Sequence, residues 1–517
     1  MLDKSVIKGY SRKLRDGLLC CLLGLLLLGN AETAHAQSTI ELLHADYTEF
    51  DRDLVDAERV IGHVKFKHDG VFMDCDSAYF YKKDNQIEAF GNIYIRQPDS
   101  FDLRGKYLKY DGVRRHATVQ EDVFLTDKEM QLNTDAIQYD IKQKLGYYTT
   151  GGKIRNGQDR LRSNTGMYDS RSKTFFFKDS VFLSNPEYTM DADTLQYNTV
   201  SKIARFYGPT YIRSEENTIY CEYGWYNTNS NLSQFSKGVY IEGRNNKLYA
   251  DSMVYNRNSG DGQAFGNLEL IDTLEDVRIF GDTGLYNRFN ERTIILGKPL
   301  AIKYYDDDSL MLKADTLIDQ TDTLTRRREL LAYKNAVIFS GDMQAIADSL
   351  VYSFTDSIIN LYQEPILWNE ENQITGDTVK ILQAKSRLDK MFVRSNSFII
   401  SEDRVDQYNQ IKGRNMVAFF HNNEIRSVDV KGNGQSVYYA KEDSVKYSGV
   451  NSIVCSDMHI NIDSNKVRDI TFFSSPEGTF YPIEKFPASK KRLPDFKWWI
   501  EKRPVAESFS ERLRKRH

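Results

Sequence analysis

The stretch Ala192-Asp193-Thr194-Leu195-Gln196-Tyr197 decides the fold, because close copies of it recur at a period of about thirty residues. Ala250-Asp251-Ser252-Met253-Val254-Tyr255 and Ala347-Asp348-Ser349-Leu350-Val351-Tyr352 are two of these copies. A fixed period of this size is typical of a stacked array, in which one copy buries its apolar face only against the next copy. We therefore expect a repeat protein rather than a compact enzyme core.

The Asp of each copy defines a column, which serves here as position zero of the repeat. An apolar residue usually stands three positions before the column and again two positions after it, and an aromatic residue stands four positions after it in most copies. A two-residue alternation thus slips by one residue across the column, which predicts a strand that bulges or bends there. The column holds Asp46, Asp76, Lys106, Asp135, Asn164, Asp193, Glu222, Asp251, Asp282, Asp315, Asp348 and Asp377.

The second half of each repeat predicts another bent strand. Residues 87–95, with Gly91-Asn92 at their centre, and residues 263–270, with Gly266-Asn267, are examples. A central Gly indicates a bend or a close backbone approach, and Asp/Asn/Lys/Ser clusters between the strands are typical of turns. The predicted fold is all-β: an elongated β-jellyroll or solenoid-like stack of two-strand repeats. The column Asp is expected to hydrogen-bond the backbone at each corner.

The N-terminus resembles a secretory signal peptide, assigned to residues 1–36. Basic residues between positions 4 and 15 precede a Leu-rich run over 17–29, and Ala34-His35-Ala36 forms a small-x-small cleavage site before Gln37. An uncleaved anchor is the alternative. Removal of residues 1–36 leaves 64 basic and 70 acidic residues, and this mild acidity argues against a nucleic-acid partner.

The sequence contains no motif for catalysis, a metal or a cofactor. It lacks a Gly-rich phosphate loop, an HExxH motif and a Cys pair at zinc spacing, so no catalytic residue, no metal ligand and no cofactor is predicted. A hydrolase built on a carboxylate pair is the enzymatic alternative, but an Asp that recurs in every repeat is expected to be structural. Cys75, Cys221 and Cys455 remain after removal of residues 1–36, and their odd number and wide spacing indicate no disulfide framework. Cys75 and Cys221, which directly precede the Asp column, are predicted to be small buried residues.

The repeat pattern divides the chain into four predicted parts. They are the signal peptide 1–36, the β-repeat domain 37–404, degenerate β-repeats or a cap over 405–484, and a basic, Trp-containing tail over 485–517. Residues 425–434 and 436–440 are expected to form a hairpin. The tail is expected to be solvated with its Trp residues docked on the last strand; the alternative is a contact with a membrane surface through anionic head groups.

The strand pattern with Gly91-Asn92 and Gly266-Asn267, followed by Ala-Asp strands, resembles the OstA-like family. This family comprises periplasmic lipopolysaccharide-transport proteins and the N-terminal domain of the outer-membrane translocon, and the resemblance covers about residues 40–400. It implies a non-enzymatic β-jellyroll in the periplasm of a Gram-negative bacterium, with association to the outer membrane left open. Implied partners are lipopolysaccharide or a related lipid, and other β-jellyroll proteins of the transport machinery through edge-strand pairing.

The same resemblance implies an apolar interior that shelters acyl chains. The apolar rows three before and two after the Asp column supply its candidate lining, although the same pattern fits a dry, closed core. The rival function is a periplasmic or surface β-solenoid scaffold that binds proteins or polysaccharide without catalysis. The candidate groove residues are Leu132, Ile137, Met190, Leu195, Leu248, Met253, Ile279, Leu312, Leu317 and Leu350.

Overall fold

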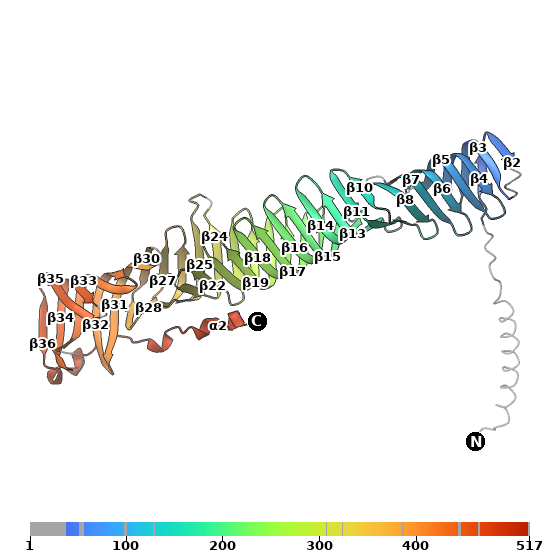
Figure 1. Cartoon of the computed structure of the whole chain (residues 1–517). Helices are drawn as coiled ribbons and strands as arrows, with labels where there is room; N and C mark the ends of the chain where they lie inside the picture. The colour runs from blue at the N-terminus through green and yellow to red at the C-terminus, as the bar shows by residue number, and fades with distance from the viewer. Residues whose placement is uncertain are drawn as a thin grey trace, which may run out of the picture. The chain divides into compact units, whose positions relative to one another are not determined.

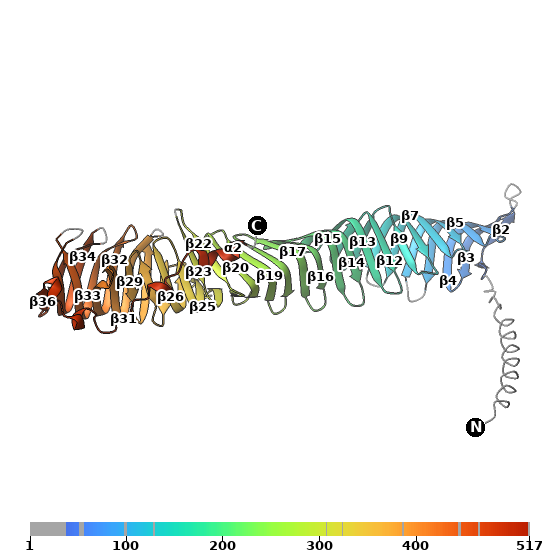
Figure 2. The same ribbon diagram turned by 90° about the horizontal axis from the view of Figure 1, so that it is seen from below.

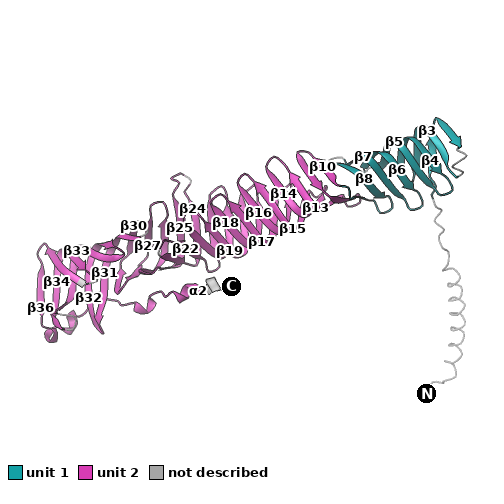
Figure 3. Cartoon of the chain, viewed as in Figure 1, with its two compact units in different colours: residues 1–150 teal, residues 151–517 magenta. Residues whose placement is uncertain are grey.

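The computed structural model describes residues 38–50, 56–97, 101–127, 130–306, 308–322, 324–384, 387–442, 446–463 and 466–514. The predicted signal peptide lies outside these residues and stays a prediction, as do the predicted domain boundaries. The chain divides into two compact units, residues 1–150 and 151–517 (Figure 3). We describe each unit by itself.

Both units are built almost entirely from antiparallel strands, which confirms the predicted all-β fold (Figure 1). The strands of unit 1 are β1 (Glu41–His44), β2 (Tyr47–Phe50), β3 (Glu58–His68), β4 (Val71–Tyr81), β5 (Gln86–Gln97), β6 (Phe101–Asp111), β7 (His116–Asp127), β8 (Met130–Asp140) and β9 (Leu145–Tyr148).

Unit 2 continues the same pattern with strands β10 to β36. They are β10 (Gly152–Asn156), β11 (Asp159–Ser163), β12 (Thr165–Asp169), β13 (Thr174–Ser184), β14 (Tyr188–Asn198), β15 (Ile203–Ser214), β16 (Asn217–Asn227), β17 (Leu232–Gly243), β18 (Asn246–Asn256), β19 (Asp261–Asp272), β20 (Val277–Asn287), β21 (Arg292–Leu296), β22 (Leu300–Tyr304), β23 (Ser309–Lys313), β24 (Thr316–Thr321), β25 (Arg328–Phe339), β26 (Met343–Ser353), β27 (Ile358–Tyr362), β28 (Ile366–Asn369), β29 (Asn372–Thr375), β30 (Thr378–Ala384), β31 (Arg387–Arg404), β32 (Gln407–His421), β33 (Glu424–Lys441), β34 (Tyr447–Asp463), β35 (Lys466–Phe473) and β36 (Glu477–Tyr481).

The helical segments of the described residues are short and follow β36. They are the 3-10 turns η1 (Ile483–Lys485), η2 (Ala488–Lys490) and η3 (Ile500–Lys502), and the helix α2 (Glu507–Arg514). Across the part of the chain that the structure describes, no helix combines the length and the apolar character needed to cross a membrane.

The long strands bend at the Asp column, as the slip in alternation predicts. In β4, Met73 and Cys75 are buried before Asp76, whereas Ala78 and Phe80 are buried after it, and Asp76 itself is exposed. The pairing of β4 with β5 shifts register between Asp74 and Ser77. A bulge at this point keeps the apolar side chains on one side of the strand while its direction changes.

Each bent strand contributes to two layers that enclose the apolar side chains. We call the halves of the Asp strands before the column, with their pairing partners, layer 1, and the remaining halves layer 2. The first half of β20 pairs with β22 and its second half pairs with β21, so the two halves extend separate ladders. This arrangement is a jellyroll-like pair of layers joined at the bends.

The corner depends on a close contact between Asp and the Gly-Asn pair of the next strand. Asn267 Nδ2 donates to the carboxylate of Asp251 at 3.0 Å, and Asn92 donates to Asp76 at 2.9 Å. Gly266 has φ +72°, and a Cβ added there would lie 2.1 Å from Oδ2 of Asp251. The predicted close approach at the central Gly is therefore confirmed, and the Asn side chain is a partner of the Asp that the sequence analysis did not name.

We predict that Gly266→Ala destabilises the corner between β18 and β19 by roughly 1–3 kcal/mol, since a Cβ at positive φ is strained and also meets Asp251. Hydrogen exchange of residues 246–272 and the midpoint of unfolding in denaturant measure the change. Gly262→Ala in the same strand is the control, because the nearest atom to its added Cβ lies at an ordinary 3.5 Å. Equal effects of the two variants would refute this account of the corner.

The repeats after Asp377 keep the same architecture with longer strands. The predicted hairpin over 425–440 is wrong, because β33 runs without a turn from Glu424 to Lys441 and only shifts register between Lys431 and Gly434. Gly432 (φ +78°) and Asn433 (φ 56°) form the corner of this strand. The Gly-Asn-Gly sequence predicts a turn, but here the left-handed residues produce a bend inside one strand. Cys75 and Cys221 are buried, as predicted, and Cys455 is buried as well; all three are unbridged.

Residues 482–510, which we call the strap, pack along the outer face of layer 1 of unit 2 (Figures 1 and 2). Three aromatic side chains attach it. Phe486 packs against Val437 and Tyr439, Trp498 packs with Tyr408 at 5.4 Å between ring centroids, and Phe509 is buried against Phe280 and Leu300. The strap thereby removes a large apolar surface of the sheet from water.

Buried glutamines under the strap hold its backbone. Gln410 donates to the carbonyl of Lys491 and accepts from the N–H of Leu493, both at 2.8 Å. Gln373 binds in the same way, donating to the carbonyl of Lys497 at 2.8 Å and accepting from the N–H of Trp499 at 2.6 Å. A primary amide that donates and accepts in this way pairs with an extended backbone as a neighbouring strand would.

The expectation of a solvated tail over 485–517 is therefore wrong for residues 485–510. The aromatic residues that suggested docking do pack, but Trp498 contacts β31 and β32 rather than the last strand. The sequence could not show where the strap packs, because the outward-facing row of the sheet carries its apolar side chains at single positions between polar ones. The alternative of a membrane contact through the basic side chains of this segment stays a prediction.

We predict that Phe509→Ser releases the end of the strap. Burial of a Phe side chain contributes about 1.5–3 kcal/mol, so the released population should rise roughly 10- to 100-fold. The rate of tryptic cleavage after Lys502 measures this population. Ile500→Ser is the matched control, because Ile500 is 45% exposed and its loss should leave the rate unchanged. Equal cleavage of wild type and Phe509→Ser would contradict the assigned role of Phe509.

Candidate functional site

The interior of unit 2 is partly open to solvent along strands β14–β20, residues 188–287, which we call the open stretch. The aromatic column four positions after Asp shows this change. Tyr168 and Tyr352 are buried, whereas Tyr197, Tyr226 and Tyr255 are half-buried. Tyr286, the next member, is 42% exposed. The tyrosine four positions after Asp is therefore buried in some repeats of this layer and partly exposed in others.

The apolar column three positions before Asp opens over the same strands. Ile219 and Leu248 are half-buried, although Ile279 and Leu312, in the following repeats, are buried. Their cross-strand neighbours are half-buried as well: Ile212, Ile241 and Leu270. The outer ends of both layers are thus accessible in the open stretch.

The side chains nearest the corners of the open stretch are tightly packed. Leu195, Phe206 and Phe235 are buried. A Cβ added at Gly224 would lie 2.3 Å from the ring of Phe206, so this ring occupies the space above the glycine. Accessibility therefore increases from the corner toward the side where the turns of the two layers face each other, which we call the mouth.

Ion pairs connect the two layers across the mouth of the open stretch. Arg257, which follows β18 in layer 2, contacts Glu187 in the turn between β13 and β14 at 2.5 Å. Arg288, which follows β20, contacts Glu216 in the turn between β15 and β16 at 2.6 Å. Pairing with Glu187 is the first cause that raises the pKa of Arg257, and for Arg288 a hydrogen bond to Tyr255 comes before Glu216.

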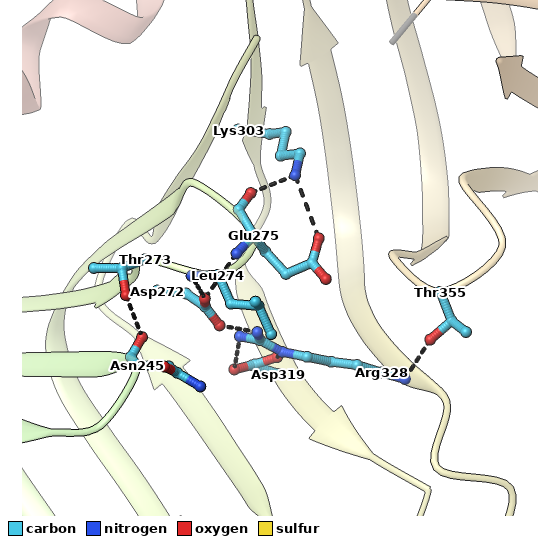
Figure 4. Close-up of polar contacts among 9 residues, drawn as sticks. All are labelled: Asn245, Asp272, Thr273, Leu274, Glu275, Lys303, Asp319, Arg328 and Thr355. Atoms are coloured by element: carbon cyan, nitrogen blue, oxygen red, sulfur yellow. Dashed lines mark hydrogen bonds and ion pairs between the residues drawn. The ribbon is translucent and has the colours of Figure 1, made fainter. Parts of the chain in front are cut away.

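A buried ion network, the latch, closes the mouth beyond the open stretch (Figure 4). Arg328, at the start of β25, donates to both carboxylate oxygens of Asp319 at 3.1 and 3.0 Å and also pairs with Asp272 at the end of β19. Asp319 occupies the column that holds an aromatic residue in most repeats. Burial raises the pKa of Asp319 and lowers that of Arg328, so each charge depends on the other.

In unit 1 the mouth is closed by the segment before β1. Ile40 is buried, and its N–H donates to Oδ1 of Asn85 at 2.8 Å. His68 at the end of β3 lies 2.5 Å from the hydroxyl of Tyr110, which belongs to layer 2. The ring of Phe101 packs on that of Tyr139 at 4.5 Å between centroids. In the aromatic column of unit 1, Phe80, Tyr110 and Tyr139 are therefore covered, whereas Phe50 at the edge strand β2 is exposed.

The ten predicted groove residues lie on the inward face, but they fall into three groups. Leu132 and Ile137 are buried in unit 1, and Leu312, Leu317 and Leu350 are buried in unit 2 beyond the open stretch. Met190, Leu195, Met253 and Ile279 lie on the open stretch and are buried, and Leu248 alone of the ten is half-buried. Their contact with lipid stays a prediction.

The residues at the mouth were not predicted as site residues. Tyr226, Tyr255, Ile241, Arg257 and Arg288 belong to this group. The aromatic column was visible in the sequence, but neighbouring repeats have the same residue type and differ in how far its side chain is exposed. A usable signal existed for the arginines, since Arg occupies the sixth position after the Asp column only at Arg52, Arg257 and Arg288.

Comparison with known proteins identifies the first part of the chain. A family model described as OstA-like protein matches residues 37–193 and 189–251. Residues 37–251 are therefore similar to the OstA-like family. The matched residues include Gly91-Asn92, one of the two Gly-Asn pairs on which the resemblance is based. They also include the larger part of the open stretch.

One of the similar solved structures is LptH from Pseudomonas aeruginosa, described as the LptA homologous periplasmic component of the conserved lipopolysaccharide transport device. It is 12% identical, with a TM-score of 0.18, and the match covers 19% of this chain and 75% of LptH. None of the curated proteins matches. Within the described residues, no group of three His, Cys, Asp or Glu side chains could hold a metal ion.

We predict that Arg328→Met destabilises unit 2 by roughly 3–5 kcal/mol, because it leaves two buried carboxylates without their cation. Unfolding in denaturant measures the change. Arg257→Met is the matched control, since an exposed ion pair contributes only about 0–1 kcal/mol. The triple variant Asp272→Asn, Asp319→Asn, Arg328→Met should recover part of the loss, and equal stability of the single and triple variants would contradict the network.

Proposed function

We propose that this protein carries lipopolysaccharide or a related lipid, with the acyl chains held along the open stretch. The supporting observation is a row of half-buried, inward-facing apolar side chains inside a chain segment that matches the OstA-like family. Leaving apolar surface in water costs about 25 cal/mol per Å², and a contiguous accessible apolar strip marks an interaction site. Acyl chains have the apolar character and the length to cover such a strip.

The shape of the open stretch suits a ligand that moves along it. The buried side chains near the corners form a continuous apolar base, while the mouth leaves head groups in water. Contacts of this kind are non-directional and similar from one repeat to the next, so displacement by one repeat changes the free energy little. The proposed role is transport or outer-membrane assembly without a chemical step.

The location and partners of the protein follow from the same proposal. The signal peptide would deliver the chain to the periplasm of a Gram-negative bacterium, with Gln37 as the first residue. Strands β1 and β2 pair with β3 on one side and carry exposed apolar residues, with Tyr47 71% and Phe50 81% exposed. This edge is suited to pairing with another β-jellyroll protein of the transport machinery.

We predict that a photo-crosslinking residue at Leu248 captures lipopolysaccharide, and that one at the buried Leu350 captures much less. Leu248 is half-buried on the inward face of the open stretch, whereas Leu350 lies in the closed part of the interior. Gln196, on the outward face of β14, is the second control and should give no adduct. The yield of lipid adduct on the purified full chain is the measurement.

The matching substitutions separate transport from folding. Leu248→Asp should abolish lipid capture by a crosslinking residue at Tyr226. The β signal in circular dichroism should be retained, because a carboxylate at this half-buried position is still hydrated. Leu195→Asp should instead lose structure, since Leu195 is 1% exposed. Folded protein that yields no lipid adduct at Leu248 or at Tyr226 would refute the transport proposal.

The rival proposal is a scaffold that binds polysaccharide or protein on its outer face. A row of tyrosines across β15–β18 on the outside of layer 1 favours it, with ring centroids of Tyr211 and Tyr220 at 4.9 Å and of Tyr240 and Tyr249 at 5.0 Å. The same crosslinking residue at Tyr240 distinguishes the two functions. Capture of polysaccharide or protein there, without lipid capture at Leu248, would favour the scaffold.

A further inference from the structure

We propose that Arg257 and Arg288 form an anion site at the mouth of the open stretch, which binds the phosphate of a phosphorylated lipid whose acyl chains lie inside. This inference rests on the proposed function and adds the chemical class of the head group. It is drawn from the position of the two arginines in the repeat, the exposure of their ion pairs and their proximity to the half-buried tyrosines.

The two arginines are placed by the repeat itself. Each is the first residue after its strand and stands six positions after the column Asp, at Asp251 and at Asp282. The same position in the other described repeats holds neutral residues or Lys: Lys82, Gly112, Ile141, Ser170, Thr199, Thr228, Thr321, Phe354 and Gln383. The guanidinium groups therefore occur where the mouth is open, and consecutive repeats present them on the same side of layer 2.

The ion pairs that hold these arginines are weak enough to exchange. The side chains of Arg257 and Glu187 are 45% and 58% exposed, and those of Arg288 and Glu216 are 48% and 64% exposed. Exposed pairs of this kind contribute little to stability, in contrast to a buried network such as the latch. A phosphate offers a higher charge and a bidentate partner for a guanidinium, so it can replace the glutamate.

The arginines also lie near the apolar ligand site. After Glu187, Tyr226 contributes to the raised pKa of Arg257, and Tyr255, followed by Glu216, raises the pKa of Arg288. Both tyrosines are half-buried members of the aromatic column that lines the open stretch. An amphiphile whose chains lie against these rings would place an anionic group at the guanidinium groups, while its remaining head group stays in water. Displacement of Glu187 and Glu216 would at the same time release the connection between the layers.

The test compares a lipid that carries phosphate with its dephosphorylated counterpart, using the purified full chain and detergent-dispersed lipid. Arg257→Gln with Arg288→Gln should weaken binding of the phosphorylated lipid tenfold or more and leave binding of the dephosphorylated lipid unchanged. Glu187→Gln with Glu216→Gln should strengthen binding of the phosphorylated lipid, because the arginines lose their competitor. Arg213→Gln is the control, since Arg213 pairs with Asp191 on the outward face of the same strands.

The outcomes separate this proposal from the one it rests on. An equal loss for both lipids, or no loss for either, overturns the phosphate site. Inorganic phosphate should not compete at millimolar concentration; binding of inorganic phosphate alone that is lost in the double Arg variant would assign the site to free phosphate and overturn the lipid assignment. Absence of any lipid adduct at Leu248 refutes the transport proposal, whereas an adduct that does not depend on phosphate refutes only the arginine site.

Discussion

The bend at the Asp column is the constraint on which the rest of the structure depends. A straight strand alternates between two faces, and a strand shared by two layers must keep one face inward through a change of direction. The chain achieves this with a one-residue slip, left-handed residues at the corner and an Asn that bonds the Asp of the neighbouring strand. Because this occurs in consecutive strands, the corners align and an enclosed apolar interior follows.

The exposure of its inward-facing side chains, rather than a change in residue type, distinguishes the open stretch from the closed parts. Its apolar residues are the same types as those in the core of unit 1, and its corners are packed in the same way. The mouth is what differs. In unit 1 a buried segment and aromatic contacts cover it. In unit 2 exposed ion pairs cross it along the open stretch, and the buried ion network of Asp272, Asp319 and Arg328 closes it after β19. Buried and exposed ion pairs therefore differ in how readily they open. Loss of one partner from a buried pair costs much stability, whereas loss of one partner from an exposed pair costs little.

The sequence predicts most of the fold but only part of the site. Periodicity fixes which face of each strand is inward, which is why Leu195, Ile279 and Leu317 are buried as expected. It does not determine the distance between layers, so Leu248 and Ile279, which occupy the same column, differ in exposure for reasons that lie in distant turns. The hairpin expected over 425–440 failed because Gly-Asn-Gly can produce a bend as well as a turn. The packing of Phe509 against Phe280 joins segments too far apart for any local pattern.

The strap is synthesised after the face that it covers, and this order matters for folding. Residues 280–450, which include the covered face, are synthesised before the residues that cover them. Until Phe486, Trp498 and Phe509 are made, Gln373 and Gln410 lack their hydrogen-bond partners on the strap, and apolar side chains beside them are uncovered. Such a row can pair with any extended polypeptide nearby, including another copy of this chain. Docking of the strap therefore covers a surface that is prone to aggregation. A chain that stops before residue 482 keeps that surface exposed.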